Sequence, residues 1–175
     1  MRKIILILLA LMFSAIIFSA CGKSSVVEVK NEIYGNISIT PAESDTVVYP
    51  DKSGQIDIYG KHHVNIQGAL IQNEKFDIIL GYKTFKNDSY VQFMEFHYSQ
   101  YTESVTFDGL IGYTYTESGI HYLFFPAKAS DAARVVAIYS PATVGVAEGS
   151  RMSGDAAREL AKTEEVQKTL ETLKF

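Results

Sequence analysis

The chain has 175 residues, a formal net charge of −4 and one cysteine. Its length suits a single domain behind a targeting segment, and a core of that size folds without a metal or disulfide staple. The acidic balance argues against a nucleic-acid partner and against electrostatic adhesion to anionic lipid. A lone cysteine excludes an internal disulfide.

Residues 1–20 have the pattern of a secretory signal peptide. Arg2 and Lys3 precede an apolar run, Ile4–Phe18, that only Ser14 interrupts. A helix over this run is roughly 22 Å long, whereas the hydrocarbon core of a bilayer is about 30 Å thick. The run is short for a permanent span. We therefore predict a cleaved signal peptide, and an uncleaved N-terminal anchor is the alternative.

The residues that close this run carry a second signal. Phe18-Ser19-Ala20 stand directly before Cys21, and Gly22 follows it. The run resembles the lipobox of bacterial lipoproteins, in which small residues precede an acylated cysteine, although Phe18 stands where leucine is usual. The resemblance implies cleavage after Ala20 and a diacylglyceryl thioether on Cys21, with a further acyl chain such as palmitate on the new amino group.

A lipid on Cys21 also accounts for a free thiol in an exported chain. Two or more acyl chains anchor a protein stably, whereas one chain holds it only marginally. Loss of Arg2 and Lys3 with the signal leaves the mature chain with a charge of −6. We expect an extracytoplasmic protein, lipid-anchored to the cell membrane through Cys21. The outer membrane is the alternative in a Gram-negative cell.

Residues 21–31 are predicted to form the lipid anchor and a short tether, and residues 32–175 a single domain. Apolar and polar residues alternate over its first half between turn signals, which is typical of half-buried strands. We predict extended structure over Asn36–Thr40, Thr46–Tyr49, Gln55–Gly60, Val64–Ile71 and Phe76–Tyr82.

Tyr90–Tyr98 is predicted to be an interior strand, because both of its alternating faces are partly apolar. An antiparallel meander follows. Asp108-Gly109 is the strongest hairpin signal in the chain, and Glu117-Ser118-Gly119 is a second turn. These turns separate strands predicted around Val105–Phe107, Leu110–Thr116, Ile120–Phe125 and Arg134–Ser140.

Ser153–Lys174 is predicted to be helical, with Ser153 as N-cap. Its apolar residues form two clusters on opposite sides of one continuous helix: Ala157, Leu160 and Ala161, then Val166, Leu170 and Leu173. One straight amphipathic helix does not change its apolar face. We therefore predict a break near Lys162–Thr163, with Thr163 capping a second short helix. The fold class is α+β, an antiparallel sheet with C-terminal helices packed on it.

The closing residues, Leu170-Glu171-Thr172-Leu173-Lys174-Phe175, are similar to the end of PsbP-like proteins, which closes on a serine or threonine, an aliphatic residue, lysine and phenylalanine. The resemblance covers roughly Asn36–Phe175. It implies an antiparallel sheet packed between helices and an accessory role, as in photosystem subunits or a Ran-binding import factor, without a shared catalytic centre. This chain has no clear N-terminal helix of the kind usual in that fold.

Three side chains are weak candidates for a metal site. On a strand, Glu95 and His97 share a face, and His121 on another strand is able to complete the set. The alternative, a solvated or hydrogen-bonded strand edge, is favoured because no second spaced pair supports a metal. His62 and His63 are adjacent and face opposite ways on a strand.

The sequence contains no catalytic constellation. A Gly-x-Ser-x-Gly elbow is missing, and Gly145–Ser150 lacks the lysine of a phosphate loop. We predict a non-catalytic binding or accessory domain without a cofactor, whose partner is a protein or a small molecule. The alternative is a hydrolase or metal-dependent enzyme of the cell envelope.

The aromatic residues, eleven Tyr and ten Phe without Trp, have two interpretations. Core packing is favoured, because aromatic side chains suit pleated sheet surfaces. The alternative is a ligand-binding groove on the sheet. Its candidate residues are Tyr82, Tyr90, Tyr98, Tyr113, Tyr115 and Tyr122.

Overall fold

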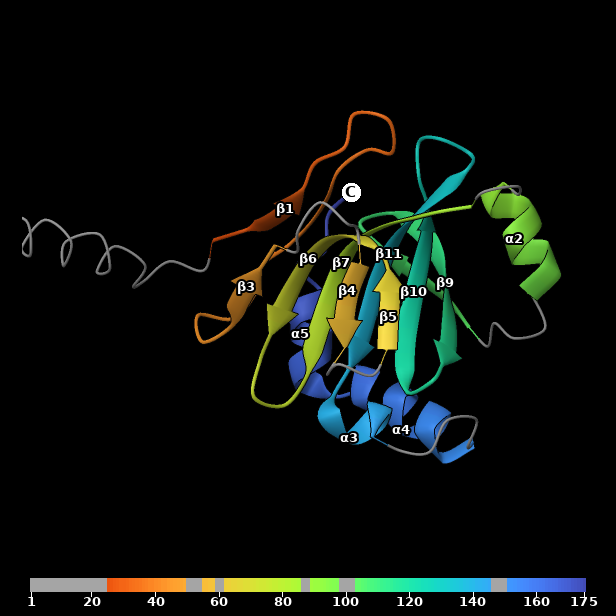
Figure 1. Ribbon diagram of the computed structural model, residues 1–175. Coiled ribbons are helices and arrows are strands. Elements are labelled where there is room, and N and C mark those ends of the chain that lie inside the picture. Colours follow the sequence, from red (N-terminus) through yellow and green to blue (C-terminus); the bar gives the residue numbers. More distant parts are fainter. Residues whose placement is uncertain (1–24, 50–54, 59–61, 86–88, 98–102, 146–150) are drawn as a thin grey trace, which may run out of the picture.

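The structure is a computed structural model, and it describes residues 25–49, 55–58, 62–85, 89–97, 103–145 and 151–175. The fold is α+β, as predicted: a seven-stranded antiparallel sheet with the C-terminal helices packing on it (Figure 1). The strand order is β3-β6-β7-β11-β10-β9-β8. The strands of this sheet are β3 (Thr46–Val48), β6 (Gln67–Gln72), β7 (Asp77–Thr84), β8 (Ser104–Phe107), β9 (Leu110–Glu117), β10 (Ile120–Pro126) and β11 (Ala132–Tyr139).

Two short antiparallel pairs and four helices complete the described elements. The strand pairs are β1 (Val27–Val29) with β2 (Ile37–Ile39) and β4 (Gln55–Ile58) with β5 (His62–Asn65). The helices are α2 (Tyr90–His97), α3 (Pro141–Val144), α4 (Arg151–Ala161) and α5 (Glu164–Leu170).

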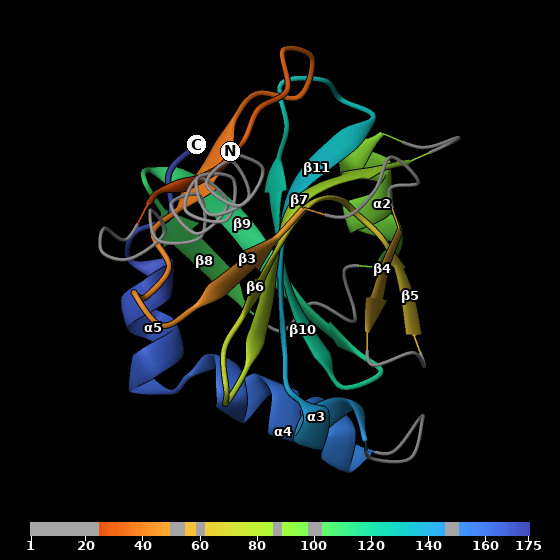
Figure 2. The same cartoon turned by 60° about the vertical axis from the view of Figure 1, so that its left-hand side comes forward.

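The sheet has a separate core on each face. One core gathers side chains of β1, β2, α4 and α5 against the sheet, and the other gathers side chains of β4, α2 and α3. Figure 2 shows α4 and α5 on one side of the sheet and α2 with the β4–β5 pair on the other. β11 lies between β7 and β10, and all eight of its residues are buried. The alternating sides of this central strand therefore reach both cores.

The two hairpins of the meander have the backbone that their sequences predict. Asp108 and Gly109 have φ values of 49° and 77°, and Ser118 and Gly119 have φ values of 51° and 77°. Positive φ at both central residues is the requirement of a type I′ turn, which matches the twist of antiparallel strands. β8, β9 and β10 consequently pair in chain order.

The prediction of a strand over Tyr90–Tyr98 is wrong, because Tyr90–His97 is the helix α2. Ser89 starts it with a capping box: the Gln92 N–H donates to Ser89 Oγ at 3.2 Å, and the Ser89 N–H donates to Gln92 Oε1 at 2.8 Å. Tyr90 and Met94, one turn apart, are buried against the sheet. The four-residue spacing of Tyr90 and Met94, which is typical of a helix, was present in the sequence together with the alternation that suggested a strand.

The predicted break between the C-terminal helices is confirmed, since α4 ends at Ala161 and α5 begins at Glu164. Ala161, Val166 and Leu170 consequently enter the same core. Thr163 occupies the N-cap position, but its hydroxyl donates to the Leu160 carbonyl at 2.8 Å instead of capping α5.

Two predicted boundaries are also wrong. α4 begins at Arg151, so Ser153 lies inside the helix and is not its N-cap. The predicted tether, residues 21–31, contains the strand β1, in which Val27 is buried and pairs with Ile39. The folded domain therefore begins earlier than the sequence pattern indicates.

Candidate functional site

The strand face that was to bring Glu95 and His97 together does not exist, because both positions lie on the helix α2. His121 lies on β10, on the opposite side of the sheet, and forms a hydrogen bond with Thr116. Among the residues that the structure describes, no group of three His, Cys, Asp or Glu side chains is placed to hold a metal ion.

Cys21 and the signal peptide lie outside the described residues, so their roles stay predictions. In the described part of the chain, no helix has both the length and the apolar character needed to span a bilayer. The backbone of His62 and His63 is part of β5.

The six tyrosines proposed for a groove do not share one surface. Tyr82 belongs to the core that also contains residues of α4 and α5, and its hydroxyl contacts the carbonyl oxygens of Val29 and Gly35. Tyr98 lies outside the described residues. The others contribute to the opposite core: Tyr90, Tyr113, Tyr115 and Tyr122.

Three of the rings on that second face lie in a row. Tyr115 and Tyr122 stack with ring centroids 6.1 Å apart, and Tyr122 stacks on Phe124 at 5.7 Å. Burial is the largest cause that raises the pKa of Tyr115 to about 12, and it also raises the pKa of Tyr122. Tyr115 and Tyr122 are partly buried and pack against the core on this face of the sheet.

A cleft of about 1010 Å³ lies elsewhere, where three segments far apart in the sequence meet. Its walls are the loop between β2 and β3, the turn between β6 and β7, and α5 with the turn that follows it. The described lining residues are Thr40, Pro41, Ala42, Glu43, Ser44, Asn73, Glu74, Lys75, Phe76, Glu165, Lys168, Thr169, Glu171 and Thr172.

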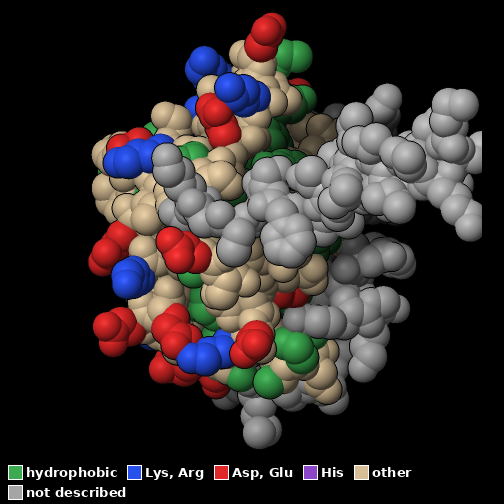
Figure 3. All heavy atoms as spheres, turned by 90° about the vertical axis from the view of Figure 1, so that its left-hand side faces the viewer, with side chains coloured by type: hydrophobic (Ala, Val, Ile, Leu, Met, Phe, Trp, Pro, Cys, Tyr) green, Lys and Arg blue, Asp and Glu red, His purple; other side chains and the backbone are tan. Residues whose placement is uncertain are grey.

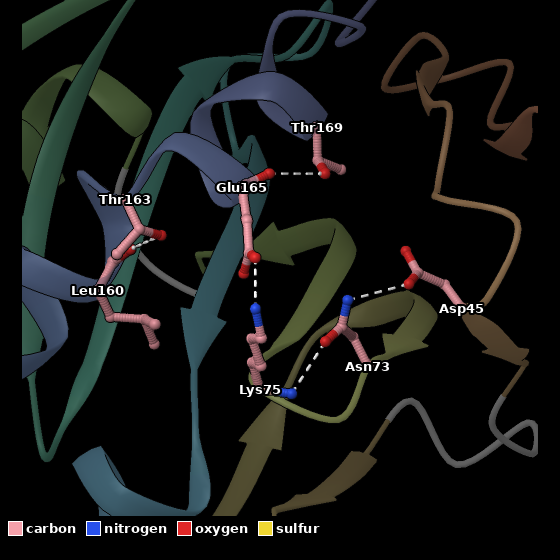
Figure 4. A network of polar contacts seen from close by, with 7 residues as sticks. All are labelled: Asp45, Asn73, Lys75, Leu160, Thr163, Glu165 and Thr169. Carbon is pink, nitrogen blue, oxygen red and sulfur yellow. Dashed lines mark hydrogen bonds and ion pairs between the residues drawn. The ribbon is translucent and has the colours of Figure 1, made fainter.

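A polar network holds the first two walls together (Figure 4). The Asp45 carboxylate accepts hydrogen bonds from the Ala42 N–H at 2.9 Å and from the Asn73 side-chain amide at 3.1 Å. Asn73 Oδ1 in turn accepts the Lys75 N–H at 2.8 Å. The Lys75 ammonium group forms an ion pair with Glu165 at the start of α5, so the network reaches the third wall.

The third wall is also fixed to the first. The Thr40 N–H donates to Thr172 Oγ1 at 2.8 Å, and the Thr172 hydroxyl lies 2.7 Å from the Thr169 carbonyl oxygen, to which it donates. One residue further on, Leu173 is buried in the core. These contacts connect the loop after β2 to the end of α5.

The cleft has a mixed but acidic rim. Four of the described lining residues are glutamates and two are lysines, and acidic and basic side chains are interspersed over this face of the molecule (Figure 3). Phe76, which is 3% exposed, supplies an apolar side chain among the lining residues. The surplus of carboxylates favours ligands that are neutral or positively charged.

Sequence reasoning did not find this cleft. Asn73 was a local signal, because asparagine side chains bond to their own backbone in turns. Thr169 and Thr172, three positions apart near a helix end, were another. Neither signal says which segments meet, since the contact between Thr40 and Thr172 spans 132 positions.

Comparisons with models of known protein families, with curated proteins and with solved structures find no match to this chain.

Proposed function

We propose that this chain is an extracytoplasmic lipoprotein, anchored through Cys21, whose domain binds a polar ligand in the cleft beside α5. The cleft itself is the observation that carries the binding role. It is about 1010 Å³ in volume, and hydrogen bonds between its walls preorganise it. Preorganised concave sites avoid the ordering cost that a flexible surface pays on binding.

The ligand class follows from the size and the groups of the cleft. Its volume reaches the upper end of the range for small-molecule sites, roughly 300–1,000 Å³. Hydroxyl, amide and carboxylate groups alternate with a few apolar side chains along its walls. An extended ligand with many hydrogen-bonding groups and a neutral or positive charge matches this lining. We propose a short peptide segment of that charge.

The proposed role is accessory and not catalytic. None of the described residues that line the cleft is a histidine or a cysteine, the side chains that most often supply a base or nucleophile near neutral pH. The binding groups are short polar side chains held by backbone contacts, which suits recognition.

We also propose that the resemblance to PsbP-like proteins reflects a related fold. The C-terminal run supports this, because it is part of the domain. Leu173 is buried, Lys174 pairs with Ser38 of β2 through two backbone hydrogen bonds of 2.9 Å, and the Phe175 ring lies 4.6 Å from the Phe125 ring.

The test uses the full-length lipoprotein, extracted from membranes in detergent. Short labelled peptides of matched length, which differ only in carrying lysine, glutamine or glutamate, are titrated by fluorescence polarisation. The proposal predicts tighter binding of the lysine and glutamine peptides than of the glutamate peptide. Glu171→Gln is expected to reduce the preference for lysine by up to about fivefold, which corresponds to about 1 kcal/mol for an exposed charge.

Glu95→Gln is the matched control, because it removes the same charge from an exposed position on α2, on the other side of the sheet. It is expected to leave the preference unchanged. Equal binding of the three peptides, or no binding of any, would contradict the proposed peptide-binding role.

A further inference from the structure

A second, smaller cavity lies between the sheet and the two C-terminal helices. It has a volume of about 90 Å³, which is about three times the share of liquid volume of one water molecule. Side chains of β8, β9, β10, α4 and α5 line it. The polar and charged ones are Glu103, Thr114, His121, Arg158, Lys162 and Gln167.

His121 lines this cavity from the sheet. It is 6% exposed, and its Nδ1 atom lies 2.7 Å from Thr116 Oγ1. This contact fixes the ring orientation and uses one of the two ring nitrogens. The second ring nitrogen, Nε2, is the one left to bond a ligand.

Two cations line the cavity from the other side, Arg158 of α4 and Lys162 directly after the end of that helix. Arg158 donates from Nη1 to Asp155 at 2.9 Å, while its Nε atom is buried without a partner among the described residues. Lys162, one turn later, lies 3.5 Å from Glu159. Buried N–H groups without an acceptor cost free energy, so the Arg158 Nε–H group is a donor for a ligand.

The charges act on the ring directly. The pKa of His121 is lowered to about 4, first by burial and then by the positive charges of Arg158 and Lys162. Glu103 is the acidic side chain that lines the cavity, and it is not among the causes of this shift. Two cations therefore lie beside a neutral ring at this cavity, and each also forms an ion pair with a carboxylate of α4.

We propose that this cavity is a binding site for a small oxyanion, a phosphate or carboxylate group, held by Arg158, Lys162 and His121. Both cations attract the charge, and guanidinium groups bond oxyanions with strong charge-assisted hydrogen bonds. The volume admits one such group and little more. Glu103 opposes a second negative charge, so a monoanionic group is favoured over a dianionic one.

Anion binding and the protonation of His121 are then coupled. A bound anion stabilises the imidazolium form, so it raises the pKa of His121. By linkage, the affinity for the anion increases as the pH falls toward the pKa of the ring. The acidic side chains of α4 next to the two cations are Asp155, which pairs with Arg158, and Glu159, which pairs with Lys162.

The test is a calorimetric titration of the full-length lipoprotein in detergent, in Bis-Tris chloride, with inorganic phosphate in one arm and acetate in the other. Saturable binding of one equivalent is expected in at least one arm, and the arm identifies the group. Arg158→Gln is expected to weaken the affinity about tenfold or more, and Lys162→Gln to weaken it less. Lys30→Gln, which removes a lysine charge from the loop directly after β1, is expected to leave the affinity unchanged.

A second readout needs no variant. The ring signals of His121 are followed by NMR through a pH titration with and without the ion, and the ion is expected to raise the midpoint. Absence of saturable binding in both arms, an unchanged midpoint, or equal losses in the Arg158 and Lys30 variants overturns the proposal. The peptide titration of the larger cleft is independent of this result, so the two proposals fail separately.

Discussion

The Thr40 N–H donates a hydrogen bond of 2.8 Å to Thr172 Oγ1, across 132 positions of the sequence. The same hydroxyl donates to the Thr169 carbonyl at 2.7 Å. The Thr172 side chain thus links the loop after β2 to the turn after α5. Since these two segments are walls of the large cleft, the shape of the candidate site depends on a contact between the two ends of the domain.

Thr172→Val is expected to reduce the free energy of unfolding by about 1–2 kcal/mol, because a partly buried N–H group loses its acceptor. Thr172→Ser keeps the hydroxyl and is expected to lose less than half of that amount. Urea unfolding followed by circular dichroism measures both changes. Equal losses in the two variants would show that the methyl group, and not the hydrogen bond, carries the effect.

Gly109 and Gly119 allow the cost of backbone strain to be measured apart from the cost of steric crowding, because they have the same φ value and different surroundings. Gly109 and Gly119 both have φ of 77°. A Cβ atom at Gly109 meets nothing within 4 Å, whereas one at Gly119 lies 2.3 Å from the Thr143 carbonyl oxygen. Gly109→Ala is expected to cost about 1 kcal/mol of unfolding free energy through backbone strain alone.

Gly119→Ala is expected to cost at least about 1 kcal/mol more, because α3 has to move away from the turn between β9 and β10. Urea unfolding of the two single variants is the measurement. Similar costs at both positions would mean that the contact between this turn and α3 is not tight.

The capping box of α2 predicts that the Ser89 hydroxyl stabilises the folded protein. Ser89→Ala removes the acceptor of the Gln92 N–H and is expected to cost about 1 kcal/mol of unfolding free energy. Ser104→Ala, at an exposed position of the edge strand β8, is the control and is expected to change it by less than about 0.5 kcal/mol. Equal effects would speak against a capped helix at Tyr90–His97.

The lowered pKa of His121 predicts that the free energy of unfolding depends on pH. Its pKa is lowered to about 4 in the folded protein, first by burial and then by Arg158 and Lys162. Above about pH 6.5 the ring is neutral in both states and contributes no pH dependence. Between pH 6.5 and 4 the unfolded chain takes up a proton that the folded chain does not, so the free energy of unfolding falls as the pH falls.

The slope in that window is expected to approach about 1.4 kcal/mol per pH unit. His121→Asn removes the titrating group and is expected to flatten it. Urea unfolding at a series of pH values in chloride buffers tests this prediction. A wild-type slope identical to that of the variant would show that His121 is not held in its neutral form.

The two hairpins and the helix break were predictable because their causes are local. Asp108-Gly109 carries its turn type in two residues, and the change of apolar face between Ala161 and Val166 is visible in the spacing alone. The prediction of a strand over Tyr90–Tyr98 was wrong because the apolar residues of that segment fit both the two-residue period of a strand and the 3.6-residue period of a helix. Its capping residue, Ser89, was the signal that decides between them.

The candidate sites were not predictable in the same way. Asn73 and Thr172 are ordinary turn residues until the fold brings their segments together. His121 was considered as a metal ligand with Glu95 and His97, and the sheet places it on the other face, beside Arg158. Which side chains converge depends on long-range pairing, which local patterns do not contain.

We propose that a lipid on Cys21 holds the domain on a membrane. The most direct measurement is the mass of the N-terminal peptide of the protein isolated from cells, together with acyl-chain labelling of the wild type and of Cys21→Ser. A lipid anchor at this position predicts a peptide that begins at an acylated Cys21 in the wild type and no label in the variant. A wild-type protein that retains Met1, or that carries an unmodified Cys21 thiol, would contradict it.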